Sequence, residues 1–179
     1  MQNAPVSTKA YVAPPPPTVV PIPPPPAFLP AKPRLRPDNW ATRHFHDFLV
    51  QRRKMPFVWG SNDCALFAAD GIKAITGIDI AADFRGQYTT QLGALAAIKK
   101  ITGGSTVADA AAYCAAKNPL FVKLEHPLMA QRGDLVIATN GDGGPIAGLI
   151  HLTGSQVVTV SENGLFTLPI TSVTAAWHY

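Results

Sequence analysis

Proline is distributed unevenly along this chain of 179 residues, and that distribution constrains the fold more than any other feature. Thirteen of the 18 prolines lie in residues 1–37, where the run PPPP occurs twice and Asp and Glu are absent. Proline lacks a backbone N–H and fixes its own φ, so this segment should favour polyproline II over helix or sheet. We therefore predict an extended proline-rich arm over 1–37 and one folded domain over 38–179.

The arm also carries the excess charge of the chain. The formal net charge is +4, and all 11 acidic residues lie in the domain, balanced there by 11 of the 15 basic residues. The remaining four basic residues are Lys9, Lys32, Arg34 and Arg36. Four dispersed charges fall short of the dense Lys/Arg clusters that bind polyanions, so nucleic acid is not an expected partner.

Apolar runs and cysteines bear on location and cofactors. No apolar run reaches about 18 residues, so no membrane span is expected. Prolines interrupt the apolar runs near the N-terminus, which does not resemble a signal peptide, so we expect synthesis in the cytoplasm with Cys64 and Cys114 reduced. These cysteines and five scattered histidines lack the spacing of a zinc site, and no metal or other cofactor is predicted.

Helical and strand signals in the domain are separated along the chain. Helical patterns cover 38–54, with Asp38 as the predicted cap, and then 64–75, 90–101 and 106–117. After Pro127 come the short β-rich runs GDLVIAT, AGLIHL, QVVTVS and GLFTLPI, separated by turn signals such as NGDGGP and ENG. Helices followed by strands predict an α+β domain with the helices packed on one side of an antiparallel sheet.

Cys64 lies where the extended segment FVWG, 57–60, gives way to a helix that Asn62 and Asp63 can cap. A cysteine at a helix N-terminus is suited to nucleophilic catalysis, because the helix dipole and unpaired N–H groups favour the thiolate. Cysteine is also among the most buried residue types, and a helix beginning CALFAA could bury it for packing alone. The local pattern leaves both interpretations open.

The order of these motifs resembles that of the NlpC-type peptidases, papain-like cysteine hydrolases that cut peptidoglycan stem peptides and occur in bacteria and phage tails. The matching pieces are FVWG at 57–60, DC at 63–64, GDLV at 133–136 and IAGLI at 146–150. A phage-associated group of this type is more similar still, through DCALFAAD at 63–70, TGIDIAADFRGQY at 76–88 and GLFTLPITSVTAAW at 164–177. The resemblance covers 38–179 and implies a papain-like fold with Cys64 as the nucleophile.

Some residues that assist the nucleophile in this family are replaced in the present sequence. The resemblance places the catalytic histidine at Ile146, which accepts no proton, and Phe57 where a tyrosine hydroxyl helps to hold the oxyanion. Losing one oxyanion donor costs roughly 100- to 1000-fold in rate, and losing the base removes thiol activation. His151 is the alternative base, but its odd offset from Ile146 points to the opposite strand face unless a bulge intervenes. The other histidines, His44, His46, His126 and His178, belong to no recognisable catalytic strand.

Two main hypotheses follow. In the first, the chain is a structural component of a phage tail tip in the virion, a degenerate NlpC-type domain without activity whose arm binds other tail proteins. In the second, it is an active cysteine peptidase that cleaves stem peptides of host peptidoglycan during infection. The catalytic losses favour the first, and so does the arm, since an extended polyproline segment binds partners at reduced entropic cost. An arm that serves only as a disordered spacer is also compatible with the composition.

Overall fold

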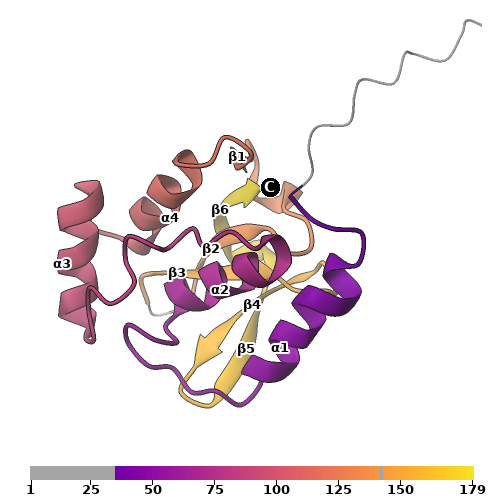
Figure 1. Ribbon diagram of the computed structural model, residues 1–179, viewed down its shortest axis with the longest axis horizontal. Helices are drawn as coiled ribbons and strands as arrows, with labels where there is room; N and C mark the ends of the chain where they lie inside the picture. Colours follow the sequence, from indigo (N-terminus) through magenta and orange to yellow (C-terminus); the bar gives the residue numbers. More distant parts are fainter. Residues whose placement is uncertain (1–34, 142) are drawn as a thin grey trace, which may run out of the picture. The chain divides into compact units, whose positions relative to one another are not determined.

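The computed structural model describes residues 35–141 and 143–179. The predictions made for residues 1–34 lie outside this part of the chain. The described residues form an α+β domain in which helices pack against a six-stranded antiparallel sheet (Figure 1). The predicted fold class is therefore confirmed at this level. Within the described ranges, no helix has both the length and the apolar character needed to cross a membrane.

Helices occupy the first part of the domain, one in each predicted helical segment. A π-helical turn, Trp40–Phe45, continues into α1, His46–Arg52, and is followed by α2, Cys64–Thr76, α3, Gln91–Thr102, and α4, Val107–Ala116. Side-chain caps start α2, α3 and α4, whereas the first helical segment begins after Asn39 with no side-chain cap. The prediction that Asp38 caps this segment is therefore wrong.

The sheet has the strand order β1-β6-β2-β3-β4-β5, with every neighbouring pair antiparallel. Its strands are β1 Val122–Lys123, β2 Leu135–Thr139, β3 Pro145–Ile150, β4 Gln156–Ser161, β5 Gly164–Pro169 and β6 Val173–His178. Four of these strands were predicted, and β1 and β6 were not. The sequence of β6, VTAAWH, has no clear alternation, and the strand is defined by its pairing with the distant β2.

Each face of the sheet has its own apolar cluster. Beneath the helices, Phe67 and Ile72 of α2 pack with Ala147 and Leu149 of β3 in the main core. A smaller cluster on the opposite face includes Val136, Ala138, Ile150, Val157 and Ala176, with Ile146 packed against it. In Figure 1, α2 lies across the middle of the sheet and α3 stands at the edge of the domain beside α4. Successive side chains of β3 therefore point to opposite faces of the sheet, so every second side chain of this strand faces α2.

Leu35 and Arg36, assigned to the arm from the sequence, contact the folded domain. Leu35 packs against the main core. The Arg36 guanidinium lies 4.8 Å from the ring centroid of Trp40 and 4.2 Å from that of Tyr179, and it pairs with the buried carboxylate of Asp134. The ordered contacts of the domain thus begin before residue 38.

Candidate functional site

A tight turn directly precedes Cys64, the first residue of α2. Val58 and Asn62 form an isolated antiparallel bridge, so the FVWG segment folds back on itself. Gly60 in this turn has a φ of 74°, and a Cβ there would lie 1.9 Å from the backbone oxygen of Tyr88. Glycine meets both requirements, so this residue fixes the direction in which the chain enters α2.

Asp63, the N-cap of α2, has a buried carboxylate that accepts four hydrogen bonds. One oxygen accepts from the backbone N–H groups of Ala65 and Leu66, at 3.1 and 3.0 Å. The other accepts from the Gly60 N–H at 2.9 Å and the Tyr88 hydroxyl at 2.8 Å. Burial and the Asp63 charge raise the pKa of Tyr88, so its hydroxyl stays a donor. Asp63 is thus a fully bonded cap rather than a free base.

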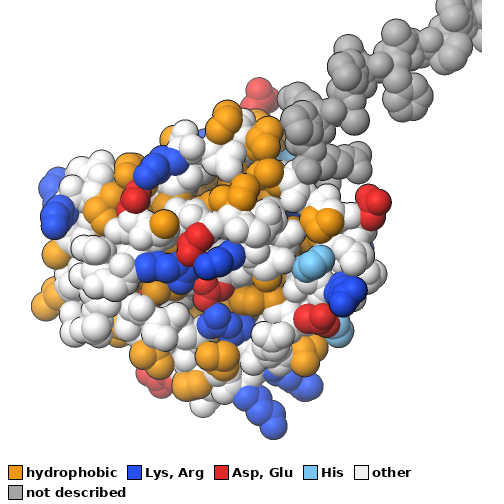
Figure 2. Space-filling model, viewed as in Figure 1, with side chains coloured by type: hydrophobic (Ala, Val, Ile, Leu, Met, Phe, Trp, Pro, Cys, Tyr) orange, Lys and Arg blue, Asp and Glu red, His pale blue; other side chains and the backbone are white. Residues whose placement is uncertain are grey.

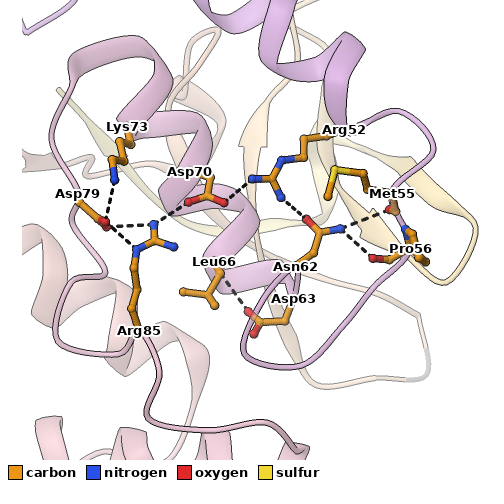
Figure 3. A network of polar contacts seen from close by, with 10 residues as sticks. All are labelled: Arg52, Met55, Pro56, Asn62, Asp63, Leu66, Asp70, Lys73, Asp79 and Arg85. Carbon is orange, nitrogen blue, oxygen red and sulfur yellow. Dashed lines mark hydrogen bonds and ion pairs between the residues drawn. The ribbon is translucent and has the colours of Figure 1, made fainter.

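A second layer of polar contacts holds this turn against the neighbouring elements (Figure 3). Arg52 of α1 donates to Asn62 at 2.7 Å and to Asp70 of α2 at 2.6 Å. Arg85, in the segment after α2, donates to Asp70 and Asp79, both at 2.6 Å. Figure 2 shows charged side chains of both signs side by side over this part of the surface. The network ties α1, the start of α2 and the α2–α3 connection together, so the surroundings of Cys64 are built from three separate segments.

Cys64 opens onto a cavity of about 740 Å³ between α2, α3, α4 and β3. Much of its wall is apolar, including Trp59, Leu66, Phe84, Leu95 and Ile98. Among the described residues, Asp63 and Glu162 are the charged members of its lining, and none of the described Lys, Arg or His residues lines it. A cavity of this size with an apolar wall and a few polar groups is typical of a ligand site.

The surroundings of Cys64 favour the neutral thiol. The residue is half-buried, and loss of water raises its pKa from 9.0 to about 11. The backbone N–H of Ala147 opposes this rise, and the negative charge of Asp63 adds to it. At neutral pH the sulfur is therefore protonated, although it lies at a helix N-terminus.

The strand opposite Cys64 differs from the expectation in one detail. Ile146 lies on β3 and is among the residues that line the cavity, but its side chain packs with the apolar cluster on the far face of the sheet. Ala147 is the residue whose side chain lies beneath α2 and whose N–H favours the Cys64 thiolate. Alternation along β3 accounts for the difference, because adjacent residues point to opposite faces.

His151, the alternative base, lies away from the cavity. It follows the end of β3, and its Nδ1 lies 3.2 Å from the Thr153 hydroxyl and accepts from the Thr153 N–H at 3.2 Å. His151 follows Ile146 by five positions, which corresponds to roughly 16 Å along an extended strand. Distance along the strand, rather than the face on which it lies, separates His151 from Cys64. Its pKa is lowered by burial.

The remaining histidines also lie outside the cavity lining. His44 and His46 are exposed on the first helical segment, and His126 accepts a hydrogen bond from the Leu128 N–H at 3.3 Å. The structure thus brings no imidazole to Cys64.

Asp134, in the GDLV motif, centres a second polar cluster that the sequence did not reveal. Its buried carboxylate pairs with Arg36, accepts from the Gln131 N–H at 2.7 Å and lies 2.9 Å from Nδ1 of His178. This cluster joins residues about 100 positions apart, so local patterns carry no signal for it beyond the motif itself. Tyr88 was likewise missed as a partner of Asp63, although it ends the TGIDIAADFRGQY block.

Both cysteines are free thiols, and both line the cavity. Burial raises the pKa of Cys114 to about 12, so this thiol is also neutral. Among the described residues, no group of three or more His, Cys, Asp or Glu side chains is placed to hold a metal ion.

Fold and site together define an α+β domain with a helix-capping aspartate and a cysteine at the mouth of an apolar cavity. Residues 35–179 match the model of a family described as a domain of unknown function, DUF6950, and the chain belongs to this family. The match begins at Leu35, a residue that packs against the main core. No curated protein and no solved structure matches the chain.

Proposed function

We propose that the chain is a structural component of a phage tail tip, a degenerate NlpC-type domain of papain-like ancestry that is docked into the tail through its proline-rich arm. The order of the FVWG, DC, GDLV and IAGLI motifs supports the NlpC-type assignment. The basic, proline-rich segment 1–37 supports docking, because polyproline segments bind neighbours without a large ordering cost. The virion tail is accordingly the proposed location.

The observation that carries the loss of activity is the absence of a base at Cys64. All five histidines lie within the described residues and none of them lines the cavity, and the carboxylate of Asp63 is occupied by four donors. The thiol pKa of about 11 leaves about one molecule in ten thousand as thiolate at pH 7. A cysteine hydrolase needs the thiolate, so this arrangement favours binding over bond cleavage.

Release of stem peptides from purified peptidoglycan tests this proposal. We expect the native protein and its Cys64→Ala variant to release equal, background amounts. Release that depends on Cys64 would contradict the proposed loss of activity.

The second candidate, an active peptidase of peptidoglycan, is favoured by one feature. Cys64 keeps a helix N-terminal position at an open cavity, and the N–H of Ala147 lies where it favours negative charge. Backbone donors of this kind stabilise an oxyanion in acyl-transfer enzymes. The same assay decides between the two candidates, because only the peptidase loses activity in Cys64→Ala.

A further inference from the structure

We infer that the cavity beside Cys64 binds a small aliphatic amine, with the alkyl chain among α2, α3 and α4 and the ammonium group at the mouth. The inference rests on the proposed function in one respect, that the cavity binds a ligand without cleaving it.

The inner wall of the cavity suits an alkyl chain. It is formed by Leu66 and Ala69 of α2, Ala94 and Ile98 of α3, and Ala110 of α4, all of them apolar. These helices pack through alanines, whose small side chains leave space between them. Each methylene group moved from water into such a wall should tighten binding about fourfold.

The mouth of the cavity suits a cation. Phe57 and Trp59 belong to the cavity lining and are partly exposed, and their rings meet edge to face with centroids 4.8 Å apart. Glu162, exposed in the turn between β4 and β5, also lines the cavity. Aromatic faces and a carboxylate both attract an ammonium group.

The same lining disfavours an anion. Asp63 and Glu162 are both acidic, and the described lining contains no Lys, Arg or His that could balance a carboxylate or phosphate. Asp63 is already saturated by its four donors, so among the described lining residues Glu162 is the charge available to a ligand. Charge at the mouth therefore selects ammonium over carboxylate at equal chain length.

Isothermal titration calorimetry of the full chain with octylammonium, octanoate and octanol tests both halves of the inference. We expect one saturable site for octylammonium, at least tenfold weaker binding of octanoate, and weakening of about fourfold for each methylene removed in the hexyl and butyl amines. Absence of a saturable site would overturn the inference, and so would equal affinity for octanoate or octanol. This measurement does not depend on hydrolysis, so it fails separately from the stem-peptide assay.

Two matched pairs of variants locate the site. Glu162→Gln should weaken octylammonium binding about fivefold, whereas Glu125→Gln, which changes an exposed glutamate outside the cavity, should leave it unchanged. Leu95→Ser should weaken binding severalfold, whereas Leu92→Ser, on the same helix but outside the lining and 80% exposed, should not. These positions are at the surface, so the variants should fold. Equal effects within either pair would overturn the placement of the ligand.

Discussion

The ionisation of Cys64 offers the most direct test of the reasoning about the site. The structure predicts a thiol pKa of about 11 in place of 9.0, because burial removes water from the sulfur and Asp63 adds negative charge. Two pH units correspond to about a hundredfold lower thiolate fraction at neutral pH. Since the thiolate is the species that reacts with iodoacetamide, alkylation should be about a hundredfold slower than for an ordinary cysteine.

The assay follows alkylation of a Cys114→Ala variant from pH 6 to 12 by intact-mass measurement. Cys114 is buried in an alanine-rich helix, so alanine at this position leaves Cys64 as the single reactive thiol. Restricted access to the cavity lowers the rate at every pH, but it does not move the midpoint of the pH profile. The midpoint is therefore the decisive quantity, and circular dichroism across the range confirms that the protein stays folded.

A midpoint near 11 is expected. A midpoint at or below 8 would show that Cys64 is an activated nucleophile with a base that the structure does not place beside it. That result would refute the argument for a degenerate site. Stem-peptide release would then be expected as well.

Two further outcomes follow from the packing, and a third follows from the proposed function. Arg36→Ala should destabilise the domain by about 3–5 kcal/mol in urea unfolding, because it leaves the buried charge of Asp134 without its arginine, and an unchanged midpoint would contradict this. Gly60→Ala should lower the free energy of unfolding by more than about 3 kcal/mol, because its Cβ would overlap a backbone oxygen. Gly77→Ala, with a similar φ but open space around it, should lower it by about 1–2 kcal/mol. Equal losses would contradict the role of the turn. Deletion of residues 1–30 should leave thermal unfolding unchanged but prevent incorporation into phage particles, and normal incorporation would show that the arm is only a spacer.

Local signals in the sequence predict most of the helices and strands. Asp63 and Gly77 bound α2 as the capping pattern predicts, with the glycine at a φ of 79°. The turn sequence ENG separates the hairpin strands β4 and β5. These features depend on neighbouring residues only, so they can be predicted from a single sequence.

Features that depend on distant pairings could not be predicted in this way. β6 is a strand because β2 lies beside it, and its alanine-containing sequence has little intrinsic preference for that state. The choice between Ile146 and Ala147 as the neighbour of Cys64 depends on which face of β3 meets α2, and a shift of one residue reverses it. In the sequence, Arg36 is one more charge on the arm, and its pairing with the distant Asp134 is visible only in the folded domain.

The packing around Cys64 also explains how the site keeps its shape without a base beside the thiol. The contacts that hold the turn before Cys64 are made among Gly60, Asp63 and Tyr88, and they are present beside a neutral thiol. Apolar side chains around unfilled space forgo dispersion contacts that a filled core would gain, so an open cavity costs stability. A ligand that fills this space recovers those contacts and stabilises the folded state in proportion to its affinity. A domain of this kind therefore has a physical basis for specific binding that is independent of any catalytic step.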